Sequence, residues 1–354
     1  MEFKKRVIVC GVGFGQFYLR ALEKMTQEYE LAGIFAKGSD WAKECAQTYQ
    51  VPLYTKLDEI TKEVTDVACV VIKSTVVGGA GTDLAKAFLE KGIHVVQEHP
   101  VHADDLSECL KLAKQNKVNY SVNTFYPDLL NVQRFLSLAE KIRKESPIRM
   151  IRAECSIHVL FPLVDILGRA AGGIRPWHFE LLKPAGKDNP FCIVSGTIHN
   201  IPVCLQVQNQ LEPSNPENNL FLLHSIALTT NSGNLMMTGT NGNVIWEPCM
   251  KKEVDEAGVF RLDKADVFLD LPVFEIAGAA IAETYREMFQ KTWPDSIRKS
   301  LLRFHQELEA GKQICSDMQY LISATAAWKE LAQVIGQPML IEPYEKKAIR
   351  IEEL

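Results

Sequence analysis

The sequence predicts an α/β protein with two domains, over residues 1–126 and 127–354. Its 354 residues exceed the size of one typical core. In the first part, short apolar runs alternate with longer helical patterns, a repetition that builds a doubly wound parallel sheet. In the second part, strand-like runs follow one another with turn signals between them, which favours an α+β domain with a mostly antiparallel sheet.

The elements of the first domain follow from these runs. Apolar, β-branched segments bounded by glycine or polar residues are typical of strands, and longer amphipathic segments are typical of helices. The expected strands are Arg6–Cys10, Tyr29–Ala36, Val67–Lys73, Ile93–Gln97 and Asn119–Tyr126. The expected helices are Phe17–Glu28, Trp41–Tyr49, Gly81–Lys91 and Ala103–Lys117.

The second domain begins with one long expected helix over Pro127–Lys144. A strand is then expected at Ile148–Val159. Further strands, with no helical pattern between them, are expected at Phe179–Leu182, Cys192–Ile198, Pro202–Leu211, Phe221–Thr229, Gly233–Thr240 and Val244–Glu247. Helices return in the prediction at Glu275–Lys291, Ile297–Ala310 and Ser316–Gly336.

Composition excludes several classes of function. A formal net charge of −5 gives no general attraction to nucleic acid or to anionic membranes. No stretch reaches 18 apolar residues, so no membrane span is expected. None of the nine cysteines has CxxC spacing, so neither a metal site nor a redox motif is expected. We expect a cytoplasmic protein with buried free thiols.

The turn after the first strand has the pattern of a dinucleotide-binding loop. It reads Gly11-Val12-Gly13-Phe14-Gly15-Gln16. Glycines permit a tight turn and let backbone N–H groups approach a pyrophosphate at the start of the next helix. Gln16 stands where the full fingerprint has Gly or Ala, so the loop is a variant. Its place at the start of the βαβ series predicts a Rossmann domain.

The end of the second strand indicates which nicotinamide cofactor binds. NAD sites usually place Asp or Glu there to bond the ribose 2′-hydroxyl. Here Lys37-Gly38-Ser39 follows the strand, and no carboxylate occurs before Asp40. A cation and a hydroxyl suit a 2′-phosphate, so the sequence favours NADPH.

Polar residues follow the other strands at the edge where ligands of such sheets bind. Ser74 and Thr75 come after one strand, Glu98 and His99 after the next, and Tyr126 after the last. Because one helix joins the last two strands, we expect them to be neighbours, with His99 and Tyr126 facing one crevice. Both side chains can donate the proton that reduction of C=N or C=O requires.

These residues lie in stretches that resemble a known family. The stretches VCGVGFGQFYLRAL, GIFAKGS, QEHPVH and FPLVDILGRAAGGIRPW resemble the thiazolinyl imine reductases of siderophore biosynthesis, a branch of the glucose-fructose oxidoreductase/inositol dehydrogenase/MocA superfamily. Most of the superfamily carries Glu-Lys-Pro with a catalytic lysine, where this chain has Glu98-His99-Pro100. Members often have His-x-x-Asp early in the second domain, and here only Asp165 of that pair is present.

The resemblance implies NADPH-dependent reduction of a thiazoline to a thiazolidine. The substrate would be a thioester on a nonribosomal peptide synthetase carrier domain. His99 and Tyr126 would be the general acids, Glu98 would join the cofactor site, and Asp165 would either line the substrate pocket or be a charge at a helix start. A homodimer is also implied.

Two alternatives stay open on the sequence alone. One is an NADP-dependent oxidoreductase of the same superfamily that acts on a sugar, a polyol or a free imine. The loss of the usual lysine at His99 counts against sugar oxidation. The other is a regulator that binds a dinucleotide without catalysis, against which two proton donors at the crevice count.

Overall fold

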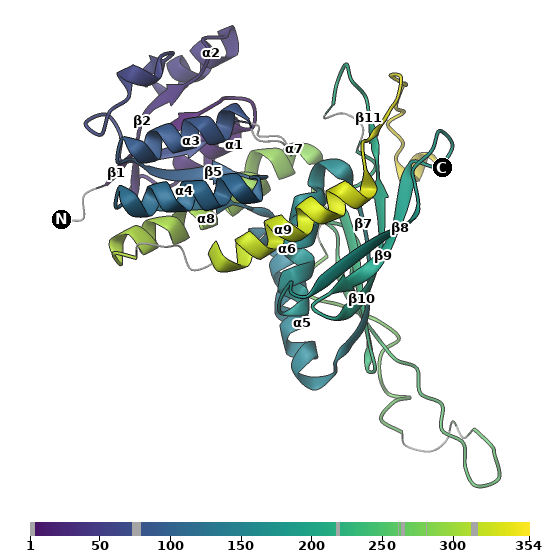
Figure 1. Ribbon diagram of the computed structural model, residues 1–354. Coiled ribbons are helices and arrows are strands. Elements are labelled where there is room, and N and C mark those ends of the chain that lie inside the picture. The colour runs from purple at the N-terminus through teal and green to yellow at the C-terminus, as the bar shows by residue number, and fades with distance from the viewer. Residues whose placement is uncertain are drawn as a thin grey trace.

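The computed structural model describes residues 4–72, 79–216, 220–260, 262, 266–280, 282–312 and 318–354. It contains two large sheets that lie side by side (Figure 1). The first is an all-parallel sheet of six strands in the order β3-β2-β1-β4-β5-β6. Its strands are β1 (Lys5–Cys10), β2 (Tyr29–Phe35), β3 (Leu53–Tyr54), β4 (Val67–Val70), β5 (His94–Glu98) and β6 (Tyr120–Asn123). Its helices are α1 (Gly15–Leu22), α2 (Asp40–Tyr49), α3 (Ala80–Glu90) and α4 (Ala103–Gln115).

The first sheet confirms the predicted doubly wound fold. Every residue of β4 is buried, as expected for a central strand covered by helices on both faces. Strands β5 and β6 are paired in parallel, with Glu98 opposite Asn123, so the ends of these two strands meet at one edge. The two-residue strand β3 was not predicted because it is too short to show a pattern.

The second sheet has eight strands in the order β15-β14-β13-β12-β7-β10-β9-β8. They are β7 (Ile148–Ser156), β8 (Trp177–Lys183), β9 (Phe191–Ile198), β10 (Ile201–Gln208), β12 (His224–Thr230), β13 (Gly233–Met237), β14 (Val244–Pro248) and β15 (Glu275–Ile276). All neighbours are antiparallel except β7 and β10. Burial alternates strictly along β12, so one face of the sheet is covered. β11 (Gln210–Leu211) and β16 (Met339–Leu340) form a separate parallel pair.

Helices cover one face of this sheet, and one of them was missed. The helical elements are η2 (Tyr126–Asp128), α5 (Leu130–Glu145), η3 (Ile157–Val159), α6 (Leu160–Ala171), α7 (Tyr285–Glu287), the π-helical turn η4 (Met288–Thr292), α8 (Trp293–Glu309), α9 (Met318–Ile335) and η5 (Ile351–Glu353). No element was predicted between Val159 and Phe179, and α6 lies there, between β7 and β8. Eleven of its twelve residues are buried, so it has no polar stripe to reveal a helical period.

Two other predicted helices were wrong in part. The helix expected from Pro127 begins at Leu130, because the 3₁₀ turn η2 precedes it. The helix expected over Glu275–Lys291 starts only at Tyr285. Its first residues form the edge strand β15, and Thr284 caps the helix by accepting the backbone N–H of Glu287 at 3.2 Å.

Helix α8 returns from the second sheet and packs on α1 of the first (Figure 1). Lys24 of α1 pairs with Asp295 of α8 at 3.0 Å. Ser296 donates a hydrogen bond of 2.6 Å to the carbonyl oxygen of Phe125, just after β6. The C-terminal part of the chain therefore fixes the edge of the first sheet at which a ligand would bind.

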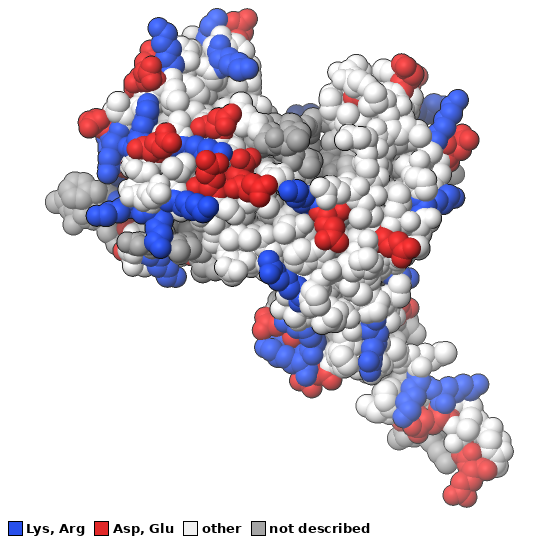
Figure 2. Space-filling view, in the orientation of Figure 1, with Lys and Arg blue, Asp and Glu red and all other residues white. Residues whose placement is uncertain are grey.

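The surface carries charges of both signs, interspersed on the face seen in Figure 2. In the part of the chain that the structure describes, no helix combines the length and apolar character needed to cross a membrane. The cysteines in that part are free thiols, and six of the eight are buried.

Candidate active site

The turn between β1 and α1 leaves open space for a ligand. Gly11 has a φ of +91°, and a Cβ there would lie 2.6 Å from the carbonyl oxygen of Val71, so only glycine fits. At Gly13, by contrast, a Cβ would meet no atom within 4 Å. Gln16 donates to the carbonyl oxygen of Gly13 at 2.9 Å and braces the turn. This is the geometry in which a helix start receives a pyrophosphate.

Two further residues of the loop, Phe14 and Gly15, pack against the protein. A Cβ at Gly15 would lie 3.2 Å from the side chain of Val9, so this glycine allows α1 to approach β1 closely. The Phe14 ring lies 5.6 Å from Phe125 and 5.8 Å from Trp293, measured between centroids. The side chain of Phe14 therefore belongs to an aromatic cluster, and its backbone belongs to the loop.

The residues that favour NADPH lie beside this loop. Lys37 is exposed, and Gly38 has a φ of +83°. Ser39 caps α2, where its hydroxyl oxygen accepts a backbone N–H of the first turn at 3.2 Å. Trp41 of α2 donates to the carbonyl oxygen of Val12 at 3.1 Å and so ties this segment to the glycine loop. A phosphate here would meet a cation, a hydroxyl and a helix start.

At the ends of β4 and β5 the predictions have different outcomes. Ser74 and Thr75 lie outside the described residues. Glu98 ends β5, and its side chain is directed at protein groups. One carboxylate oxygen accepts a short hydrogen bond from the Tyr18 hydroxyl, and the other lies 2.9 Å from Nδ1 of His99. Nothing in the sequence indicated this contact, and a role for Glu98 in cofactor binding stays a prediction.

His99 is a largely buried imidazole, 10% exposed, with a defined hydrogen on one nitrogen. Its Nδ1 lies 2.9 Å from Glu98 and 3.0 Å from the carbonyl oxygen of Asn123. Because both neighbours can only accept, Nδ1 must donate, and Nε2 is the atom left for chemistry. Burial lowers the pKa of His99, but the Glu98 carboxylate, the Asn123 carbonyl and the charge of Asp165 together raise it above its usual value. Phe161 stacks on the ring at 5.6 Å.

Tyr126 lies against His99, as the sequence predicted. The two ring centroids are 5.8 Å apart and the planes meet at 71°. Tyr126 is buried in η2, immediately after β6, and its ring also contacts Phe125 at 4.3 Å. An imidazole with a raised pKa and a phenol therefore meet at the carboxyl edge of a parallel sheet, close to a glycine loop. Such a site can deliver a proton to a group that accepts a hydride.

Comparison with known proteins gives the same assignment. Residues 5–124 match a family model described as "Oxidoreductase family, NAD-binding Rossmann fold". Residues 147–247 match the model for the C-terminal part of Irp3-like thiazolinyl imine reductases. The chain belongs to the glucose-fructose oxidoreductase/inositol dehydrogenase/MocA superfamily. It is therefore an oxidoreductase with an NAD(P)-binding Rossmann domain and an Irp3-like second domain.

Solved structures share the fold of this oxidoreductase at low identity. UDP-N-acetylglucosamine 3-dehydrogenase from Acidithiobacillus ferrooxidans has a TM-score of 0.66 and 13% identity, over 94% of this chain and 98% of that one. An oxidoreductase from Agrobacterium radiobacter, in complex with NAD+, L-tartaric acid and magnesium, has a TM-score of 0.67 and 10% identity, over 94% and 96%. GenD2 of gentamicin A biosynthesis, in complex with NAD, has a TM-score of 0.64 and 12% identity, over 95% of each chain. No curated protein matches the chain in sequence.

His224 is a second histidine of the oxidoreductase's site, which the sequence did not reveal. Its ring meets that of Tyr126 edge to face, at 5.3 Å and 89°. Nε2 donates to the carbonyl oxygen of Val159 at 2.9 Å, and Nδ1 lies 2.8 Å from the hydroxyl of Thr240. Burial lowers the pKa of His224 to about 4, so this imidazole is neutral at neutral pH. Its ring packs against Tyr126 and restricts where the phenol can lie. Its position at the start of an ordinary strand carries no functional signal.

Asp165 lies in the middle of α6 and is completely buried, so it is not a charge at a helix start. One carboxylate oxygen accepts from the Thr124 hydroxyl at 2.7 Å, and the other accepts from Nε of Arg169 at 2.7 Å. The guanidinium of Arg169 in turn lies 4.8 Å from the ring centroid of Tyr320. The carboxylate thus holds the end of β6 to the second domain. Substrate contact by Asp165 stays a prediction.

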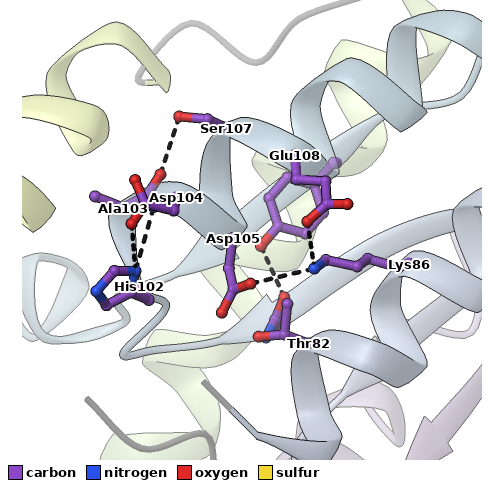
Figure 3. A network of polar contacts seen from close by, with 10 residues as sticks. Thr82, Lys86, His102, Ala103, Asp104, Asp105, Ser107 and Glu108 are labelled. Atoms are coloured by element: carbon purple, nitrogen blue, oxygen red, sulfur yellow. Dashed lines mark hydrogen bonds and ion pairs between the residues drawn. The ribbon is translucent and has the colours of Figure 1, made fainter. Parts of the chain in front are cut away.

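Two other histidines of the Rossmann domain have structural roles. His94 accepts the backbone N–H of Asn119 at 2.8 Å, and burial lowers its pKa to about 4. His102 caps α4 by accepting the backbone N–H of Asp104 at 3.3 Å (Figure 3). In the same view Lys86 reaches from α3 to two carboxylates of α4. Within the described ranges, no group of three or more His, Cys, Asp or Glu side chains is placed to hold a metal ion.

Proposed function

We propose that this oxidoreductase uses NADPH to reduce the C=N bond of a thiazoline to a thiazolidine. The substrate is a siderophore intermediate held as a thioester on a nonribosomal peptide synthetase carrier domain. The observation that carries the proposal is the contact of His99 with Tyr126 in a chain whose second domain matches the Irp3-like thiazolinyl imine reductases. His99 also stands where most of the superfamily has the lysine that serves sugar oxidation.

The protein's part in the reaction is to deliver one proton. When bound, NADPH would supply the hydride for the ring carbon, and the electron pair of the C=N bond would pass to the ring nitrogen, which then needs a proton. Tyr126 donates its phenolic proton to that nitrogen. His99 contacts the phenol, and because its pKa is raised above its usual value it can return a proton to Tyr126 through Nε2. Solvent then restores the proton on His99.

Three groups support the choice of NADPH. The exposed ammonium of Lys37, the turn at Gly38 and the Ser39 hydroxyl at the start of α2 lie beside the glycine loop. A 2′-phosphate would gain charge-assisted hydrogen bonds there. Fluorescence titration should give a lower Kd for NADPH than for NADH, and tighter NADH binding would overturn this part of the proposal.

We also propose that the protein works as a homodimer. The segment over 250–276 carries large apolar side chains that its own chain leaves exposed, namely Met250, Val254, Val259, Leu262, Val267, Phe268, Leu269, Leu271, Val273, Phe274 and Ile276. Exposed apolar surface on this scale is typical of a surface that binds protein. Light scattering should give twice the chain mass, and a monomer at micromolar concentration would contradict the proposal.

The activity is tested with a synthetic thiazoline thioester in place of the carrier-bound substrate. We expect the dihydronicotinamide absorbance of NADPH to fall only when the thioester is present, and H99N and Y126F each to reduce kcat. Full turnover by both variants and by the double variant would refute the assigned roles. Reduction of NADP+ by free polyols in place of thiazoline turnover would favour the sugar and polyol alternative. No turnover with any of these, despite NADPH binding, would favour the regulator.

A further inference from the structure

A chain of buried hydrogen bonds runs from the cofactor-binding helix α1 to His99. Nδ2 of Asn123 contacts the Tyr18 hydroxyl, that hydroxyl contacts Oε2 of Glu98, and Oε1 of Glu98 lies 2.9 Å from Nδ1 of His99. Tyr18 is fully buried, and Asn123 is 1% exposed. The Glu98 and His99 side chains are 11% and 10% exposed. The chain thus joins α1, β5 and β6 with little access for water.

The direction of each hydrogen bond follows from the chemistry of the groups. Burial raises the pKa of Tyr18 well above its usual value, and the charge of Glu98 raises it further, so the phenol keeps its proton. A carboxylate can only accept, so Tyr18 donates to Glu98 and accepts from the Asn123 amide. The Glu98 carboxylate therefore has one neutral donor on Oε2 and the imidazole on Oε1.

We propose that Tyr18 is a positioning residue, which fixes the Glu98 carboxylate and thereby sets how acidic His99 is. Without the phenol, Oε2 of Glu98 would hold a buried charge with no donor. The pair would then hold its shared proton more tightly and release it only at higher pH, so the apparent pKa of His99 would rise. The effect on catalysis rests on the proposed function, whereas the effect on the imidazole does not.

Other charged or titratable groups lie near this chain, and the Y18F change replaces none of them. Asp165 of α6 faces His99 and raises its pKa. His224 of β12 is neutral, with a pKa of about 4. Cys69 of β4 lies near Tyr18 and Glu98, and burial raises its pKa, so it is an uncharged thiol at neutral pH. A change seen in the Tyr18 variant can therefore be assigned to the lost hydroxyl.

The test compares Y18F with Y120F, because each removes one buried phenolic hydroxyl from the Rossmann domain. The Tyr120 hydroxyl donates to Oε1 of Gln97 at 2.7 Å and not to Glu98. In Y18F we expect the apparent pKa of His99 to rise by about one pH unit, the amount that one lost charge-assisted hydrogen bond can supply. In Y120F we expect it to stay at the wild-type value.

NMR titration of labelled histidine, with the His99 signal assigned by its loss in H99N, measures that pKa without substrate. The pH profile of kcat/KM with the thiazoline thioester should show its alkaline limb moved upwards by the same amount in Y18F only. An unmoved His99 signal in folded Y18F, or an equal shift in Y120F, would overturn the proposal. A moved signal in a protein that does not reduce thiazolines would instead refute the proposed function alone.

Discussion

Replacing Glu98 by glutamine should confine the activity to lower pH. The carboxylate lies 2.9 Å from Nδ1 of His99, and it is the largest contribution that raises the pKa of this imidazole. With a neutral amide there, burial would dominate and the pKa would fall below the usual value of ~6.5. An opposite charge at hydrogen-bond distance shifts a pKa by roughly 1–3 units. A fall of about 2 units lowers the fraction of protonated His99 at neutral pH by up to roughly a hundredfold.

The assay is the pH profile of kcat/KM for the thiazoline thioester, with the Kd for NADPH measured at each pH. We expect the alkaline limb of E98Q to lie about 2 pH units lower than that of wild type, with activity returning as the pH falls. E98D, which keeps the charge, should move the limb less. An E98Q profile that superimposes on wild type would refute a protonated His99 as the proton source. Activity lost equally at all pH values, together with weaker NADPH binding, would place Glu98 in the cofactor site instead.

Three further predictions concern the cofactor and the second domain. K37E should raise the Kd for NADPH at least roughly tenfold and leave that for NADH within about twofold, because only the 2′-phosphate meets the new charge. G13V should fold normally but lose dinucleotide binding, whereas G11A should lower the unfolding free energy by at least about 1 kcal/mol because of its positive φ and the nearby carbonyl. D165N should cost roughly 2 kcal/mol in urea unfolding, less than for a fully buried pair because Arg169 is 27% exposed. The K37E prediction is wrong if the ratio of the Kd values for NADPH and NADH is unchanged, and the G13V prediction is wrong if that variant binds NADPH. The other two are wrong if G11A is as stable as wild type or if D165N has the urea midpoint of wild type.

The first domain could be predicted from sequence because its strands and helices repeat a simple pattern. Short apolar runs such as Val67–Val70 differ clearly from the amphipathic helices between them. Helix α6 gave no such contrast, because it is apolar on all sides and hides Asp165 in its middle. The segment from Glu275 was predicted as a helix because its exposed apolar residues are spaced like those on one face of a helix. The spacing of apolar residues reveals a helix or strand when one face is buried. It does not identify the element when every side is buried or when no side is.

The same reasoning explains which site residues were found. The end of a parallel strand is a position that topology makes special, so His99 and Tyr126 were placed together correctly. The partner of Glu98 could not be found in this way. Tyr18 is 80 residues away on a helix, and nothing in a buried tyrosine of an amphipathic helix marks it as a hydrogen-bond donor to a distant carboxylate. His224 could not be predicted either, because it lies at the start of a strand in the other sheet and far from Tyr126 in the sequence.

The short segment after β6, residues 124–126, joins the candidate site to helices outside the first sheet. Its Thr124 hydroxyl bonds to Asp165 of α6, and the carbonyl oxygen of Phe125 accepts from Ser296 of α8. Both partners follow the segment in the sequence, in helices that lie outside the first sheet. Tyr126 follows directly, so the position of its ring depends on these two anchors as much as on the parallel sheet. A Rossmann domain expressed alone would keep His99 and the glycine loop but lose the restraint on Tyr126, and we infer that proton delivery is a property of the two domains together.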